Sequence, residues 1–120
     1  METKTIFYHS EILVNECRIA TGFLTRFKGL MGKRSLDIEQ SLFFPKCNSI
    51  HMWFMKIPIE VIFLKSIDNL SELEIVSLVR NVQPWSLFPI YDFKAEHVLE
   101  VPVGTIDKYE LIEGERLCLN

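Results

Sequence analysis

Residues Ile57 to Leu64 read IPIEVIFL, and this stretch decides the fold. Pro58 has no backbone N–H to donate to a neighbouring strand, so we expect the chain to bend, bulge or lie at an edge there. From Val61 the residues are apolar at consecutive positions, which is typical of a strand that is covered on both faces. The stretch therefore predicts the central strand of a sheet, entered through a bend at Pro58.

Further β-prone segments lie on both sides of this strand. LFF (42–44) ends at Pro45, and LEIVSLV (73–79) alternates after the turn SIDNLSE (66–72), so it should form a hairpin with the central strand. The others are TIFYH (5–9), EILV (11–14), ECRIAT (16–21), HVLEVPV (97–103) and the end of the chain through Leu117 and Leu119. The pattern predicts about seven strands joined mostly by short turns.

Helical signals are few and short. Phe27, Leu30 and Met31 have the i, i+3, i+4 spacing of one helical face, and a second helical turn is expected with Thr105 as its cap. Neither is long enough for a parallel crossover connection. The sequence therefore predicts a mainly β (β-rich α+β) fold: an antiparallel β-sandwich or partly closed barrel with two short helices.

Composition limits the function classes. A chain of 120 residues fits one domain, here residues 1–120. Its 13 basic and 16 acidic residues give a net charge of −3, the wrong sign for binding nucleic acid through its phosphates. The longest apolar run is too short to cross a bilayer, and the first residues lack the unbroken apolar run of a signal peptide. We expect no nucleic-acid partner, no membrane and a cytoplasmic location.

The three cysteines are Cys17, Cys47 and Cys118. Their odd number and the absence of CxxC spacing indicate neither a disulfide framework nor a four-thiolate zinc site. Reduced thiols in a cytoplasmic protein are the simplest interpretation.

Several segments together resemble the DUF192 family. They are, in order, RFKGLMGK (26–33), LFFPKCNSIHMWFMKIPIEVIFL (42–64), AEHVLEVPVGTI (95–106) and EGERLCL (113–119). The resemblance covers roughly residues 17 to 119. It implies a compact, mainly β domain, and it brings no established reaction, cofactor or partner. The chain departs from the family pattern at Glu60, where aspartate is usual.

A set of polar and aromatic residues lies next to apolar residues expected in the core. Buried charges are tolerated mainly when they are paired, so one interpretation is a structural ion pair joining a cation to Glu60 or Glu100. The other is a concave surface whose cations receive an anionic metabolite or a carbohydrate against a tryptophan wall. The candidate ligand-binding residues are Arg26, His51, Trp53, Lys56, Glu60 and Glu100.

Cys47 and His51 have C-x-x-x-H spacing, which would form a metal pair on a helix but spans about 13 Å on a strand. Cys47 with His51 or His97 and a carboxylate such as Glu100 could form a thiol–imidazole arrangement, although no hydrolase signature surrounds Cys47. We predict no catalytic residue, no metal and no cofactor, and we leave an enzymatic role as a minor alternative.

Two non-enzymatic functions remain open. The first is a small-ligand-binding β domain with a shallow pocket. The second is a protein-interaction module in which the loop PWSLFPIYDF (84–93) presents Trp85, Phe88 and Tyr91. An exposed aromatic patch would favour the second function. The ligand, the partner and the oligomeric state do not follow from the sequence.

Overall fold

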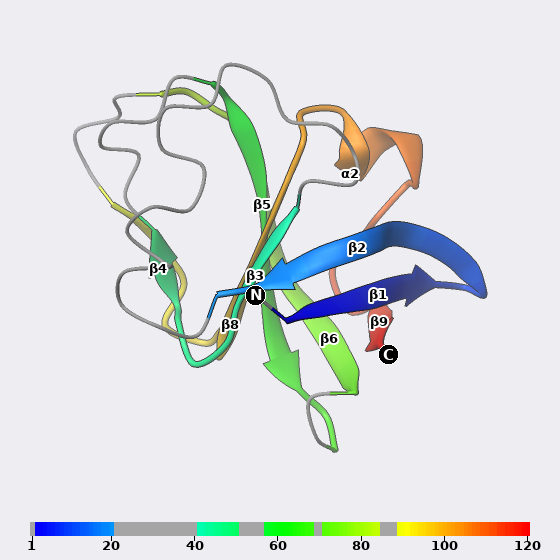
Figure 1. Cartoon of the computed structure of the whole chain (residues 1–120). Coiled ribbons are helices and arrows are strands. Elements are labelled where there is room, and N and C mark those ends of the chain that lie inside the picture. The colour runs from blue at the N-terminus through cyan, green and yellow to red at the C-terminus, as the bar shows by residue number, and fades with distance from the viewer. Residues whose placement is uncertain (1, 21–40, 51–56, 69–70, 85–88) are drawn as a thin grey trace.

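The computed structural model describes residues 2–20, 41–50, 57–68, 71–84 and 89–120. Seven strands close into a barrel in the order β1-β2-β3-β8-β5-β6-β9, and two short strands form a separate two-stranded sheet, β4-β7 (Figure 1). The barrel strands are β1 (Thr3–Tyr8), β2 (Glu11–Ile19), β3 (Leu42–Phe44), β5 (Ile59–Ser66), β6 (Glu72–Val82), β8 (His97–Val101) and β9 (Arg116–Leu119). The remaining elements are β4 (Ser49–Ile50), β7 (Ile90–Tyr91) and α2 (Thr105–Lys108). The mainly β prediction is confirmed, and the barrel is closed.

The central strand is the one predicted around Val61. β5 begins at Ile59, just after Pro58, and pairs antiparallel with β6 on one side and β8 on the other. Its first six residues are all buried. The hairpin between this strand and the LEIVSLV segment is also confirmed. Among the described residues, the barrel pairing between β2 and β3 is parallel and the other six are antiparallel.

Two apolar clusters explain why β5 is apolar at consecutive positions. Ile62 and Leu64 belong to a cluster to which all seven barrel strands contribute, so this cluster fills the barrel interior. Ile59, Val61 and Phe63 belong to a second cluster, which covers the outer face of β3, β8 and β5 and includes Ile50 of β4. Alternate residues of one strand therefore fill two cores.

A register shift in β6 changes the alternation predicted for its residues. Leu73 and Ile75 face the interior, but so does Leu78, whereas Val76 and Val79 pack on the outer cluster. The ladder with β5 is irregular between Phe63 and Leu64, which pair with Ser77 and Ile75. One extra residue at Val76 therefore reverses the faces of the strand beyond it.

The short helix differs from the prediction in its cap. Thr105 is the first residue of α2 rather than its cap, and Gly104 occupies the N-cap position with φ 97° and no side-chain hydrogen bond. The Thr105 hydroxyl donates instead to the Pro102 carbonyl at 2.7 Å. The other predicted helix, around residues 25–32, lies outside the described residues. In the part of the chain that the structure describes, no helix has the length and apolarity needed to cross a bilayer.

Candidate functional site

An open cleft of about 740 Å³ lies at the end of the barrel where β5 stops. It is built from three separate pieces of chain: the connection after β3, the last residue of β5 and the residues that lead into β8. Its volume falls within the usual range for small-molecule sites. The lining residues are Pro45, Lys46, Cys47, Asn48, Ser49, Ser66, Ala95, Glu96 and His97.

His97 joins the cleft to the barrel core. It is opposite Leu64 in the ladder between β8 and β5, so its ring lies on the interior face, and its centroid is 5.6 Å from that of Phe43. Both ring nitrogens have partners. The Lys46 backbone N–H donates to Nδ1 at 3.0 Å, and Nε2 lies 2.8 Å from the Ser66 hydroxyl oxygen. The ring is thus held in one orientation between the walls of the cleft.

These contacts fix the protonation state of His97. Because Nδ1 accepts an N–H, the proton of the neutral ring is on Nε2, which donates to Ser66 Oγ. Burial lowers the pKa of His97, and the nearby Glu96 carboxylate opposes this effect more weakly. The ring is therefore neutral at pH 7. Since the Ser66 oxygen receives this hydrogen bond, its own proton is free to be donated elsewhere.

The chain that passes Lys46 has an unusual backbone conformation. Lys46 has φ 55°, in the left-handed region that side-chain-bearing residues rarely adopt. The Lys46 N–H donates to His97, and the next N–H, of Cys47, donates to the Glu96 carbonyl at 2.9 Å. Such backbone conformations occur at ligand sites and also in ordinary turns, as at His9 and Ser10 between β1 and β2. The strained residue here lies directly on the cleft wall.

The thiol and the carboxylate of the cleft are also engaged. Cys47 Sγ donates to the Ser49 carbonyl at 3.0 Å, and Glu96 Oε1 accepts the Ser66 N–H at 2.8 Å. Both nitrogens of the imidazole are engaged with Lys46 and Ser66, and the thiol with Ser49, so Cys47 and His97 do not form a thiol–imidazole pair. No set of three His, Cys, Asp or Glu side chains suited to a metal ion occurs within the described ranges.

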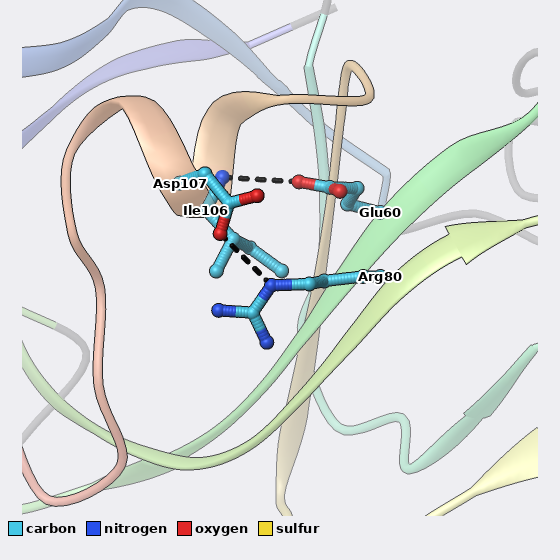
Figure 2. A network of polar contacts seen from close by, with 4 residues as sticks. All are labelled: Glu60, Arg80, Ile106 and Asp107. Carbon is cyan, nitrogen blue, oxygen red and sulfur yellow. Dashed lines mark hydrogen bonds and ion pairs between the residues drawn. The ribbon is translucent and has the colours of Figure 1, made fainter.

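Glu60 lies near the other end of β5, on the interior face, where its side chain contacts the start of α2 (Figure 2). Its side chain is only 2% exposed. Oε1 accepts the backbone N–H of Ile106 at 3.0 Å, which supplies the N-terminal acceptor that Gly104 lacks. On the solvent side, Arg80 of β6 forms an ion pair with Asp107 at 3.0 Å. Glu60 thus fixes the helix to the barrel.

Replacing Glu60 should lower the free energy of unfolding substantially, whereas replacing Arg80 should change it little. Glu60→Ala leaves the buried Ile106 N–H without an acceptor, so we expect a loss of about 2 kcal/mol in the free energy of unfolding. Glu60→Gln keeps an acceptor oxygen and should lose less. Arg80→Ala breaks an exposed ion pair and should cost less than about 0.5 kcal/mol. Urea unfolding of the three variants tests this order, and an equal loss for Glu60→Ala and Arg80→Ala would contradict it.

Glu100 faces the other side of the sheet. It pairs with Val61 of β5 and Leu42 of β3, both members of the outer cluster, whereas Glu60 pairs with Val101 of the interior cluster. The structure therefore does not bring the two predicted carboxylates together. Glu100 is 6% exposed, and burial raises its pKa to about 8. No hydrogen bond to its carboxyl group is found within the described part of the chain.

The other predicted ligand-binding residues, Arg26, His51, Trp53 and Lys56, lie outside the described residues, as do Trp85 and Phe88. The cleft itself was not predicted from the sequence. His97 was considered only as a catalytic candidate, and Cys47 as a catalytic or metal-binding candidate. Ser66, Lys46 and Glu96 carried no motif. The available signal was the Pro45–Lys46 break after a strand, which marks a loop but not its neighbours.

The DUF192 family model, described as "Uncharacterized ACR", matches residues 6–119. A UPF0127 protein of Thermococcus sibiricus is 35% identical over 111 residues, which cover 89% of this chain and 68% of that protein. A UPF0127 protein of Pyrococcus furiosus is 30% identical over 112 residues, 88% of this chain and 87% of the relative. The chain belongs to the DUF192 family, and the resemblance found in its motifs is confirmed.

Two crystal structures share the fold. A protein of Sinorhizobium meliloti, provisionally described as a transcription regulator, has a TM-score of 0.79 and 21% identity, covering 98% of this chain and 94% of that one. A protein of unknown function from Novosphingobium aromaticivorans has a TM-score of 0.77 and 22% identity, covering 96% and 82%. Identity at this level supports the fold alone.

Proposed function

We propose that this chain is a non-catalytic β domain that binds a small polar ligand in the cleft beside His97. The observation that carries the proposal is the cleft of about 740 Å³, in which a strained Lys46 backbone and a neutral His97 direct the Ser66 hydroxyl proton away from the ring. A ligand site typically has a small number of polar groups that converge on the ligand and are held rigidly. The ligand is an anionic metabolite or a carbohydrate.

The geometry of the cleft supports binding better than catalysis. To activate Ser66, His97 would have to accept the hydroxyl proton, but its Nε2 carries a hydrogen because Nδ1 accepts the Lys46 N–H. The Cys47 thiol proton is directed at the Ser49 carbonyl and not at a base. The polar groups of the cleft are thus arranged as hydrogen-bonding partners for a bound molecule.

The interaction module is the second candidate. Within the predicted loop 84–93, Tyr91 and Phe93 are 56% and 80% exposed, which favours contact with another protein.

The net charge of −3 disfavours binding to nucleic acid. Cys17, Cys47 and Cys118 are all unbridged, which suits the cytoplasm.

Thermal-shift measurements against sugars, nucleotides, phosphorylated metabolites and metal ions test the proposal. A ligand at 100 times its Kd stabilises the native state by about 2.7 kcal/mol, which raises Tm by roughly 10 °C. Asn48→Trp should fill the cleft and abolish this rise. Asn15→Trp makes the same chemical change on the exposed side of β2 and should keep it. Flat melting curves across the panel, or equal responses of both variants, would overturn the proposal.

A further inference from the structure

Two aromatic rings stand in solvent close to the cleft. Tyr91 and Phe93 are 56% and 80% exposed, and their ring centroids lie 4.7 Å apart with 36° between the planes. Single exposed apolar side chains are ordinary on a protein surface. A mutually packed aromatic pair next to a polar cleft is a different arrangement, because it provides a continuous apolar surface beside hydrogen-bonding groups.

The pairing of β4 with β7 places this surface on the side of the cleft. Ile50 and Ile90 are opposite each other and both pack on the outer cluster. Ser49 and Tyr91 form the next pair, so their side chains share the other face of this small sheet. Ser49 lines the cleft, so its pairing with Tyr91 places Tyr91 next to a lining residue, one strand away from the cleft.

The segment between the two rings is held rigidly. The Asp92 carboxylate accepts the Ser77 hydroxyl at 2.6 Å and the Lys94 N–H at 2.9 Å, and these hydrogen bonds lower the pKa of Asp92. The Asp92 N–H donates to the carbonyl of Asn48, a cleft residue, at 3.0 Å. The backbone between the two rings is thus held in place before any ligand arrives, which reduces the entropy cost of binding.

We infer that the ligand of the cleft is a carbohydrate, with Tyr91 and Phe93 as the platform on which a sugar ring stacks. A pyranose has an apolar C–H face and a rim of hydroxyl groups. The C–H face matches the aromatic surface, and the hydroxyl groups match the Ser66 hydroxyl, the Asn48 amide and the Lys46 ammonium. A small anion such as phosphate would use the polar groups and leave the rings unused. This inference rests on the proposed function of the cleft.

The test is a series of ¹H–¹⁵N NMR titrations of the full chain. The probes are glucose, galactose, mannose and N-acetylglucosamine, then maltotriose, cellotriose and chitotriose, with inorganic phosphate as the non-sugar probe. At least one trisaccharide should shift the amides of Ser49 and Ser66 together with those of Tyr91 and Phe93. The double variant Tyr91→Ala/Phe93→Ala should bind this sugar at least roughly tenfold more weakly.

Two controls separate stacking from folding. Tyr91→Phe keeps the ring and should keep the affinity. Ile112→Ala removes a side chain that is also 56% exposed but follows α2 at the other end of the barrel, and it should have no effect. The spectrum of the double variant also reports directly whether the fold persists.

Each other outcome has a defined meaning. Equal sugar binding by the double variant and the parent chain would overturn the inference while leaving the cleft as a ligand site. Phosphate binding with no response to any sugar would do the same. No shift of cleft amides with any of these probes would overturn the inference and count equally against the proposed function. Sugar shifts confined to the rings, with the cleft amides unaffected, would likewise overturn the inference, because the sugar would then bind outside the cleft.

Discussion

Phe63→Ala should lose about 4 kcal/mol of the free energy of unfolding. Phe63 is fully buried at the centre of β5, and it packs in the outer cluster between the barrel and the sheet of β4 and β7. Removing a buried phenyl ring loses its transfer free energy and leaves a cavity, which typically costs 3–5 kcal/mol. Because whole domains are stable by only about 5–15 kcal/mol, this is a large share of the total.

Phe93→Ala is the matched control, because the same side chain is removed from a position that is 80% exposed. Its effect should stay within about 0.5 kcal/mol. Urea unfolding of both variants gives the comparison, with an unchanged m-value showing that the unfolding reaction is the same. A similar loss for the two variants would mean that β5 does not lie between two cores.

The burial of Phe63 was predictable because it follows from a local pattern. Consecutive apolar residues from Val61 to Leu64 require cover on both faces, and the structure supplies the barrel interior on one side and the outer cluster on the other. The position of Leu78 on the interior face of β6 was not predictable in this way. The extra residue at Val76 changes the register, and nothing in the alternating sequence marks that position.

The helix cap and the cleft escaped prediction for a related reason. Thr105 looks like a cap in the sequence, but the acceptor for the Ile106 N–H comes from Glu60, 46 residues earlier. The cleft similarly joins Lys46, Ser66 and His97, which approach only because β3 and β5 both pair with β8. Contacts between distant segments are set by strand order, and strand order is not written in any one segment.

Glu100→Gln should remove a strong pH dependence of stability. Burial raises the pKa of Glu100 from its ordinary value of 4.5 to about 8, and its opposite neighbours Leu42 and Val61 are apolar. Between these pH values the unfolded chain loses the proton while the folded chain keeps it, so unfolding releases a proton. The contribution of the protonated carboxyl group is therefore complete below pH 4.5 and is lost as pH rises through about 8.

At 1.36 kcal/mol for each pKa unit, the difference between 4.5 and about 8 corresponds to roughly 5 kcal/mol. The glutamine amide resembles the protonated carboxyl group in shape and cannot ionise. The variant should match the parent chain near pH 5 and exceed its stability increasingly toward pH 9. Urea unfolding at intervals across this range measures the gap, and the titration of every other group cancels in the comparison.

Glu113→Gln provides the control, because it removes an exposed carboxylate from the turn at residues 113–114 and should leave the pH profile unchanged. If Glu100→Gln and the parent chain run parallel from pH 5 to pH 9, the Glu100 carboxyl group is ionised in the folded protein. A cation would then have to stabilise it from the outer face of β8. Parallel profiles would therefore favour the structural ion pair, the first of the two interpretations of the charged residues near the core.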